Sequence, residues 1–375
     1  MKKITSFGMT LFLSFAIVAC GPKMEGPEPP TGPDTKWYVG HESNASFSLD
    51  NANQLAGLAE LVNGGVDFNG KTITLTRDID LSTFSISTRA SATTNWIPIG
   101  TYDHPFRGTF NGNNKKITGL FINDETLDDA GLFGRITRGK VQNVGVELAQ
   151  GGITAGAFVG AVAGILNGGS VDNCYAVGNV SGSSYVGGVV GRIDDDLTLE
   201  PIGSITNCYA TGNVVGIGNY VGGVIGIIYG DITNCYATGS VNSTGNYVGG
   251  VVGRAHPFNS IKNCYATGSI GSDGNWVGGV VGGAFGPIED CVALNPSVSG
   301  GSFVGRVAGM GGGTNNAAWE EMTVNGAIVG TGNATNQHGA NVSTAMAKTV
   351  AFWTDTMGWS VSDWNISAGN YPTLK

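Results

Sequence analysis

Residues 220–245 read YVGGVIGIIYGDITNCYATGSVNSTG and contain the pattern that recurs along most of the chain. Three short runs in it favour β-structure, namely VGGVIG, ITNCYAT and GSVNS, with a glycine or an asparagine at each bend between them. A unit of this size cannot bury its own apolar side chains, but stacking it on similar units buries them in one continuous column. The repeat therefore predicts a solenoid of parallel strands.

The second glycine of each G-x-x-G pattern serves as an anchor for aligning the units. Successive anchors are 30, 27, 35, 27, 29 and 27 residues apart, and the longest interval contains the acidic insertion 194–201. We expect this insertion to form a loop at one corner of a coil, while equivalent strands stack about 4.8 Å apart. The anchors are Gly134, Gly164, Gly191, Gly226, Gly253, Gly282 and Gly309.

Composition supports the same fold class. The chain has 375 residues, of which 63 are glycine and 12 are proline, and glycine in a helix interior costs about 1 kcal/mol relative to alanine. Only 13% of residues are charged and 41% are apolar, whereas disorder requires low hydrophobicity and high charge. We therefore predict an all-β parallel β-solenoid (β-helix) of about seven to nine coils.

Several segments resemble bacterial proteins that carry the GLUG motif. The run 131–134 is GLFG, and NCYATG occurs at 207–212, 234–239 and 263–268. The lead-in FNGKTITLTRDIDLS, beginning at Phe68, is also typical of these proteins. The resemblance extends from about residue 54 to the end of the sequence. It implies a bacterial surface protein whose β-solenoid is like the non-catalytic part of IgA-peptidase-like proteins.

Some streptococcal members of that family are metallopeptidases that cleave immunoglobulin A, so the histidines were compared with that chemistry. A zincin places two histidines four residues apart on one helix with a glutamate between them, so that both imidazoles reach one metal. None of the four histidines has this spacing. We therefore predict no peptidase activity, no metal and no cofactor. The histidines are His41, His104, His256 and His338.

The first twenty residues have the features of a lipoprotein leader. Lys2 and Lys3 precede the apolar run 7–19, which is too short to anchor stably across a bilayer. The run ends in Ile-Val-Ala before Cys20 and so resembles the lipobox of bacterial lipoproteins. This implies a signal peptide over 1–19 and lipidation of Cys20. An ordinary secretory signal with a chance cysteine is the alternative.

The mature chain would then be an acidic protein held to a membrane only by its acyl chains. Loss of residues 1–19 removes two lysines and no acid, which lowers the net charge from −9 to −11 and disfavours nucleic acid as a partner. Residues 20–40 are rich in proline and glycine and predict a tether. Gly21 lacks the aspartate that retains enterobacterial lipoproteins at the inner membrane, which implies an outer-membrane, cell-surface location.

We expect caps at both ends of the solenoid, because exposed strand edges must be covered. Residues 41–130 would hold the first coils and a capping helix with Asp50 or Asn51 as N-cap. The repeats would span 131–310 and a C-terminal cap 311–375. A second helix is predicted over 343–357, followed by a tail that packs over the last coil. The cap tryptophans, expected in its core rather than as a ligand platform, are Trp353, Trp359 and Trp364.

One cysteine per coil forms the first of three ladders. Five cysteines remain if Cys20 is lipidated, so they cannot all pair within the chain, and side chains pointing one way suit neither disulfides nor zinc. We predict small, buried, mostly free thiols. They are Cys174, Cys208, Cys235, Cys264 and Cys291.

Two aromatic ladders are candidate ligand surfaces. One lies six residues before the anchor glycines and comprises Phe158, Tyr185, Tyr220, Tyr247, Trp276 and Phe303. The other follows the cysteines and comprises Tyr175, Tyr209, Tyr236 and Tyr265. Either could be a covered stack or an outward strip. We expect the second ladder to be exposed and to bind ligand, because a bend at Asn207 that turns Ile205 and Cys208 inward would turn Tyr209 outward.

Charged groups in the coils give weaker signals. Arg135, Arg192 and Arg254 follow anchor glycines in alternate coils and could meet an anionic polymer, although solvated arginines are the commoner case. The run 194–196 with Glu200 could offer oxygens to Ca²⁺, but it fits no known calcium pattern and leaves a metal site unsupported.

The function that fits best is a non-catalytic adhesin or stalk that binds host protein or glycan, since a solenoid repeats one weak contact along its axis. The alternative is a β-helix polysaccharide lyase or glycoside hydrolase, which needs clustered catalytic side chains in a groove. Acidic residues are scattered through the coils. We therefore predict that the protein is not an enzyme.

Overall fold

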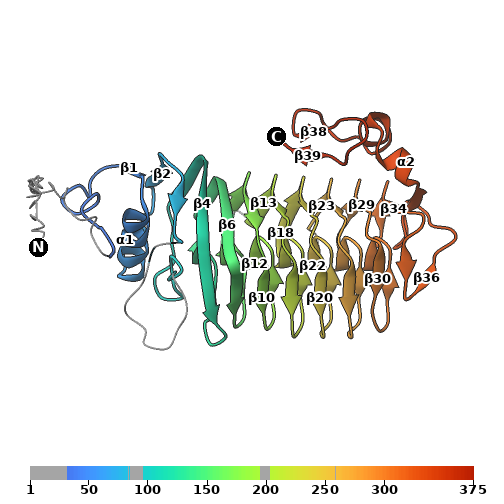
Figure 1. The fold of residues 1–375 in the computed structure, drawn as a ribbon, viewed down its shortest axis with the longest axis horizontal. Coiled ribbons are helices and arrows are strands. Elements are labelled where there is room, and N and C mark those ends of the chain that lie inside the picture. The colour runs from blue at the N-terminus through green and yellow to red at the C-terminus, as the bar shows by residue number, and fades with distance from the viewer. Residues whose placement is uncertain (1–31, 83, 85–95, 195–202, 258) are drawn as a thin grey trace, which may run out of the picture. The chain divides into compact units, whose positions relative to one another are not determined.

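The computed structural model describes residues 32–375 except 83, 85–95, 195–202 and 258. Within these residues the chain forms an all-β parallel solenoid of about nine turns, which confirms the predicted fold class (Figure 1). The predicted signal peptide, Cys20 and most of the acidic insertion lie outside the described residues. None of the described helices is long and apolar enough to cross a membrane.

The largest sheet contains three successive strands of each coil. The first column pairs in parallel from one coil to the next, and its inward positions carry branched apolar residues such as Ile205 opposite Ile232. Its strands are β1 (Ser46–Leu49), β2 (Thr72–Leu75), β4 (Thr109–Asp124), β6 (Lys140–Ala155), β8 (Ser170–Asp172), β13 (Gly203–Thr206), β18 (Gly230–Thr233), β23 (Ile261–Lys262), β28 (Ile288–Glu289) and β33 (Gly313–Thr314).

The second and third columns of this sheet follow after a bend and a glycine turn. The long strands β4 and β6 contribute to both columns, and β36 (Ala327–Ile328) closes the third as an antiparallel partner. The second column holds β3 (Ile79–Asp80), β9 (Tyr175–Val177), β14 (Tyr209–Ala210), β19 (Tyr236–Ala237), β24 (Tyr265–Ala266), β29 (Val292–Ala293), β34 (Ala317–Trp319) and β37 (Ala340–Val342). The third holds β10 (Val180–Gly182), β15 (Val214–Gly216), β20 (Val241–Ser243), β25 (Ile270–Ser272), β30 (Ser297–Ser299) and β35 (Thr323–Val324).

Two smaller parallel sheets complete each coil and contain the G-x-x-G segments. We call the seven-stranded one sheet B and the five-stranded one sheet C. Sheet C holds β11 (Val186–Gly187), β16 (Val221–Gly222), β21 (Val248–Gly249), β26 (Val277–Gly278) and β31 (Val304–Gly305). Sheet B holds β5 (Phe133–Thr137), β7 (Ala163–Asn167), β12 (Val190–Asp194), β17 (Ile225–Ile228), β22 (Val252–Ala255), β27 (Val281–Ala284) and β32 (Ala308–Met310).

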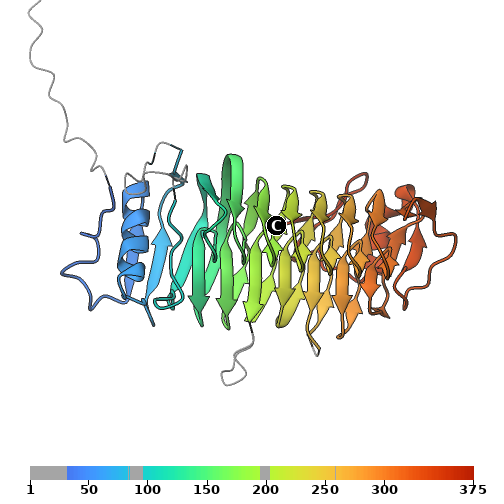
Figure 2. The same cartoon turned by 90° about the horizontal axis from the view of Figure 1, so that it is seen from below.

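The N-terminal cap is the helix that the sequence predicts. Helix α1 (Ala52–Asn63) begins after Asn51, whose side chain accepts a hydrogen bond from the backbone of Gln54. The helix lies beside the first coils (Figure 2), and its apolar stripe, which includes Leu55 and Leu58, is buried. Trp37 and Tyr38, at the end of the predicted tether, also pack onto this cap beside Phe47 and Phe68.

The C-terminal end of the solenoid is closed by backbone and a buried arginine. The amides of Val307 and Ala308 donate to the carbonyl oxygen of Gln337. The Arg306 side chain is fully buried and donates to the carbonyl oxygens of His338 and Gly339, each at 3.0 Å. These bonds supply acceptors for a cation that would otherwise be costly to bury.

The Trp-rich tail corrects one prediction about this end. The segment after β37 turns back and lies along the flank of the large sheet, where β38 (Trp364–Asn365) pairs with β39 (Thr373–Leu374) (Figure 1). It therefore covers the side of several coils rather than the last coil alone. The reason is that the second column presents an apolar flank there, including Val292 and Ala317, against which the tail residues cluster.

The predicted helix over 343–357 is interrupted. Helix α2 spans Thr344–Ala347, and a π-helical turn, η1, spans Phe352–Thr356. Between them the Thr349 hydroxyl donates to the Met346 carbonyl oxygen and accepts from the Phe352 amide. Because a threonine side chain competes in this way for backbone partners, it ends one helix and starts the next turn.

Candidate functional site

The bend at Asn207 determines which side chains reach the surface. Asn207 has a φ of 54°, in the left-handed region that asparagine tolerates better than other non-glycine residues. Ile205 and Cys208 are both buried, and Tyr209 lies on the outer side. This confirms the expected added residue at the bend. Equivalent bends occur at Asn173, Asn234 and Asn263.

The cysteine column is buried and its thiols are free, as predicted. All five thiols are free and buried in the interior cluster. Each donates to a backbone carbonyl two residues earlier, as Cys208 does to Thr206 at 3.2 Å. Burial raises the pKa of the Cys235 thiol well above its usual range, which keeps it protonated and unreactive.

The tyrosine column is continuous, but only part of it is exposed. Neighbouring rings of Tyr175, Tyr209, Tyr236 and Tyr265 are stacked nearly parallel, with centroids 5.1, 4.8 and 4.9 Å apart. Tyr175 and Tyr209 are half-buried, whereas Tyr236 and Tyr265 are only 6% and 2% exposed. The expectation of four exposed tyrosines is therefore wrong for the last two.

The C-terminal cap buries the last two tyrosines. The Tyr265 hydroxyl donates to the Pro372 carbonyl oxygen at 2.6 Å, and the Trp364 ring lies about equally close to Tyr236 and Tyr265, at 6.0 and 6.1 Å between centroids. The tryptophans are buried in this cluster, which confirms them as cap core rather than ligand platform. They are Trp353, Trp359 and Trp364.

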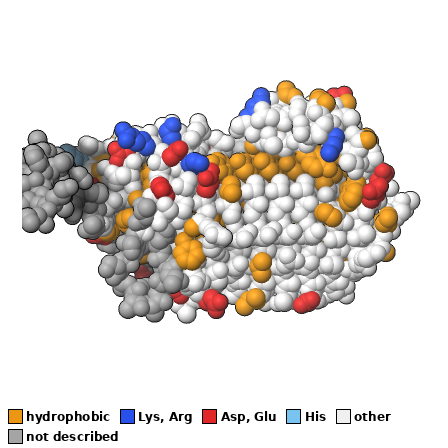
Figure 3. Space-filling view, in the orientation of Figure 1, with side chains coloured by type: hydrophobic (Ala, Val, Ile, Leu, Met, Phe, Trp, Pro, Cys, Tyr) orange, Lys and Arg blue, Asp and Glu red, His pale blue; other side chains and the backbone are white. Residues whose placement is uncertain are grey.

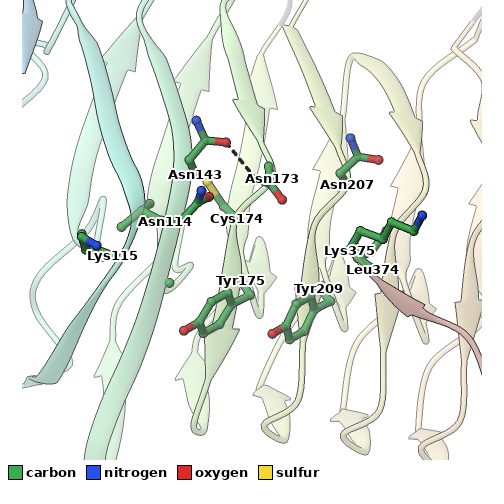
Figure 4. A pocket seen from close by; sticks show the side chains of 12 residues that line it. Asn114, Lys115, Asn143, Asn173, Cys174, Tyr175, Asn207, Tyr209, Leu374 and Lys375 are labelled. Atoms are coloured by element: carbon green, nitrogen blue, oxygen red, sulfur yellow. Dashed lines mark hydrogen bonds between the residues drawn. The ribbon is translucent and has the colours of Figure 1, made fainter. Parts of the chain in front are cut away.

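A cavity of about 320 Å³ opens where the cap ends, beside Tyr175 and Tyr209. Figure 4 shows the two tyrosine side chains on one side, asparagine side chains on another and the end of the tail beside Tyr209. The chief lining side chains are those of Asn114, Asn143, Asn173, Asn207, Lys115 and Leu374. We call this cavity the tyrosine–asparagine pocket.

The asparagine column is interrupted at this pocket. The Asn173 amide nitrogen donates to the Asn143 oxygen at 2.8 Å, and Asn234 donates to Asn207 at 3.0 Å. No hydrogen bond joins the Asn173 and Asn207 side chains, whose oxygen and nitrogen face the pocket without a partner in the column (Figure 4). The pocket therefore offers an amide acceptor and an amide donor next to aromatic surface.

Sequence reasoning found the tyrosines of this pocket but missed its amides. The signal was present, because asparagine precedes Cys-Tyr in each NCY triplet. The part played by Leu374 and Lys375 could not be read locally, since they reach the pocket through a tail that folds back from the far end. Burial and Glu147 raise the pKa of Tyr175 to about 12, so its phenol is neutral.

The other aromatic ladder covers the outer face of sheet B. Neighbouring rings stack with centroids 4.6 to 5.7 Å apart, and all six residues have positive φ. Ile165 and Ile227, on that face, are consequently only 2% and 3% exposed. The ladder itself is half-buried apart from Phe303, which is 61% exposed. The valine-rich strands are thus covered on both faces.

The three arginines after the anchor glycines lie over aromatic rings rather than in solvent. Arg135 forms an ion pair with Asp129 at 2.8 Å, and Arg192 pairs with Asp194. Arg254 lies over the rings of Tyr220 and Tyr247. Two of the three charges are therefore neutralised internally, which argues against a binding track for an anionic polymer.

Neither a metal cluster nor a dense charged patch marks the large sheet. Among the residues described, no group of three or more His, Cys, Asp or Glu could hold a metal ion. The face in Figure 3 consists mainly of uncharged side chains and backbone, with a hydrophobic stripe beside the cap and charged side chains over the early coils.

Comparison with known proteins agrees with this architecture. The model of the GLUG motif family matches residues 182–215, 217–242 and 244–271. These are GLUG repeats. They comprise strands from all three sheets, and they confirm the resemblance seen in the sequence.

Two individual proteins are similar to the chain. Halomucin from Haloquadratum walsbyi is 32% identical over 165 residues, a match that covers 43% of this chain but only 2% of halomucin. A crystal structure from Bacteroides ovatus, of a protein provisionally named as an immunoglobulin A1 protease, superposes with a TM-score of 0.59 at 20% identity, covering 88% of this chain and 92% of that one. At this identity the second similarity establishes the fold alone.

Proposed function

We propose that this chain is a non-catalytic cell-surface lipoprotein, anchored through Cys20, whose GLUG-repeat solenoid acts as an adhesin. We further propose that the tyrosine–asparagine pocket binds a glycan of the host surface. The observation that carries this proposal is the juxtaposition of the half-buried rings of Tyr175 and Tyr209 with the unpaired oxygen of Asn173 and the unpaired amide nitrogen of Asn207.

The chemistry of the pocket suits a sugar. An amide oxygen and an amide nitrogen can accept from and donate to hydroxyl groups, while aromatic side chains contact the apolar face of a sugar ring. The Tyr175 and Tyr209 rings are nearly parallel, at 9°, and partly cover one another, so a sugar would lie along their exposed edges.

The same lining argues against glycoside hydrolysis in this pocket. Glycosidases generally use two carboxyl groups about 5 to 9.5 Å apart, one on each side of the scissile bond. The residues that line the pocket include no aspartate or glutamate. The proposal is therefore one of binding without turnover, and the similar protein from Bacteroides ovatus supports the fold only.

A glycan array tests the binding proposal with a matched pair of variants. Asn207→Asp keeps the side-chain size and the tolerance for positive φ but removes the amide donor, whereas Asn242→Asp makes the same change at an exposed position on β20. We expect the unmodified protein to retain specific glycans, Asn207→Asp and Tyr209→Ala to lose at least about tenfold in affinity, and Asn242→Asp to bind normally. An array with no retained glycan, or equal binding by all variants, would rule the proposal out.

Anchoring is tested separately in cells. Cys20→Ser should release the protein from the membrane fraction and abolish incorporation of a labelled fatty acid. Protease treatment of intact cells should degrade the unmodified protein if it faces outward. Retention of the serine variant in the membrane, or protection from protease, would contradict the lipid anchor or the surface location respectively.

A further inference from the structure

Three arginines occupy the same register position on the outer face of sheet B, in alternate coils. Arg135 and Arg192 each pair with Ile165 across the intervening coil, and Arg192 and Arg254 each pair with Ile227. Arg192 and Arg254 lie over rings of the aromatic ladder, whereas Arg135 lies over the ring of Tyr102. Because their backbone settings are equivalent, differences in their surroundings come from the side chains around them.

Two of these arginines have their own carboxylate. Arg135 forms an ion pair with Asp129. Ala130 pairs with Val159 of the next coil, so Asp129 occupies the position that is equivalent to Phe158. Arg192 is bound by Asp194, two residues further along β12. In each case the guanidinium lies against an aromatic ring and an acid within its own coil.

Arg254 has the aromatic surroundings without the acid. Its guanidinium carbon lies 5.8, 5.1 and 5.5 Å from the ring centroids of Tyr220, Tyr247 and Phe285. Its Nη1 donates to the Tyr220 hydroxyl oxygen at 3.5 Å, and its buried Nε has no acceptor. No ion pair to Arg254 is formed by any residue that the structure describes.

The missing acid is explained by one residue. The position two residues after the arginine, which is Asp194 in the earlier coil, is His256 in this one. The His256 ring stacks on Tyr229 at 4.2 Å between centroids, and a histidine brings no carboxylate to this position. A half-buried guanidinium without a carboxylate partner is costly, and an anion bound at its terminal Nη groups would supply the missing charge.

We propose that Arg254 and its three rings form a binding site for a single anionic group, a carboxylate or a sulfate ester carried on a small molecule or a saccharide. The planar guanidinium presents parallel N–H donors that match the oxygens of either group, and the surrounding rings exclude water and strengthen the contact. The site is separate from the tyrosine–asparagine pocket and does not depend on the glycan proposal.

Titration with three probes tests the site on the purified protein. D-glucuronate offers a carboxylate, glucose 6-sulfate a sulfate ester, and glucose neither. We expect a saturable shift of the Arg254 Nε–Hε resonance with one or both anionic probes and none with glucose. Binding of only one anionic probe would identify which oxyanion the site takes. Failure of both to bind would overturn the proposal.

Variants that remove the arginine, or that add or remove its internal carboxylate partner, test the site more sharply. Arg254→Gln should lose binding of the anionic probe by at least tenfold, whereas Arg192→Gln, at the internally paired position, should leave it unchanged. His256→Asp should block the site by giving Arg254 an internal partner. Asp194→Asn should free Arg192 and raise the stoichiometry from about one probe to two. Probe binding that persists in both Arg254→Gln and His256→Asp would overturn the proposal.

The test is independent of the glycan pocket. Tyr209→Ala should leave the anion titration unchanged whatever it does on the glycan array. If glycan-array binding is lost and the anion titration is intact, only the tyrosine–asparagine pocket is affected. If the titration is lost and array binding is intact, only the Arg254 site is affected.

Discussion

Tyr175 and Tyr209 differ from Tyr236 and Tyr265 chiefly in whether the C-terminal cap covers them. All four follow a cysteine, pair in register and stack on their neighbours at about the same spacing. The first two border an open pocket, and the last two lie beneath the C-terminal cap. The repeat thus fixes the position of each ring, while a segment about a hundred residues away in the sequence decides whether that ring can meet a ligand.

The largest expected effect on the difference between covered and accessible tyrosines comes from removing the central tryptophan of the C-terminal cap. Trp353→Ala deletes a fully buried indole that packs on Tyr265 and donates to the Ala347 carbonyl oxygen. We expect a loss of about 3–5 kcal/mol in cap stability, measured by denaturant unfolding, with faster proteolysis of the tail. The control Met346→Ala, at a residue 43% exposed in the same segment, should change stability by less than about 0.5 kcal/mol. Equal effects would mean that the cap is not held by its tryptophans.

A methyl group placed beneath the Tyr175 ring should disturb the part of the tyrosine column that borders the pocket. A Cβ at Gly145 would overlap the ring of Tyr175, which is its register partner. We expect Gly145→Ala to cost about 1–3 kcal/mol and to weaken glycan binding, because the ring must move. Gly271→Ala, where the nearest atom is the Asn242 side-chain oxygen at 3.0 Å, should be close to neutral. Unchanged stability and affinity in Gly145→Ala would show that the Tyr175 ring can move aside without loss of packing or binding.

Deleting single hydroxyl groups should distinguish the tyrosines beneath the cap from those beside the pocket. Tyr265→Phe leaves the Pro372 carbonyl oxygen without its donor beneath the cap, so we expect a loss of about 1–2 kcal/mol. Tyr209→Phe, at the open position, should cost less than about 0.5 kcal/mol in the same unfolding experiment. Similar losses in the two variants would indicate that the hydrogen bond beneath the cap contributes little.

The smallest effect concerns ionisation at high pH. Tyr175 has its pKa raised from about 10 to about 12, chiefly by burial, so the folded state keeps a proton that the unfolded state releases. Its stabilisation is complete below about pH 10 and is lost as the pH rises towards 12. Phenolate absorbance should show Tyr175 and Tyr209 ionising before Tyr265, whose pKa is raised more strongly by its deeper burial. Tyr175→Phe should flatten the decline in stability, and an identical decline in that variant would contradict the assignment.

Local patterns were sufficient wherever neighbours in the sequence, or repetition, determine the environment. The stripe of Leu55 and Leu58 after Asn51 predicts α1 because capping and helical periodicity are local. The cysteine column is predictable because identical residues at a fixed spacing must stack. The break at Thr349 was less accessible, since helix propensity and side-chain capping oppose each other there.

Contacts between distant segments account for the incorrect expectations. Tyr236 and Tyr265 were wrongly expected to be exposed, because the return path of the tail cannot be derived from its composition. The arginines were expected in solvent because the positive φ of residues such as Tyr185, which folds its ring over sheet B, has no clear sequence signature. The ion pair of Arg192 could have been suspected from Asp194 two positions later.

By itself, the sequence determined the coil, the stacking of equivalent positions and the inward direction of the cysteine column, because stacking identical units leaves little choice. Only the tertiary structure decided which rings stay accessible, where the asparagine column opens and which arginine lacks an acid. Those properties depend on a tail that folds back over the flank and on substitutions at single positions of otherwise equivalent coils. Repetition makes the framework predictable, and departures from repetition create the candidate sites.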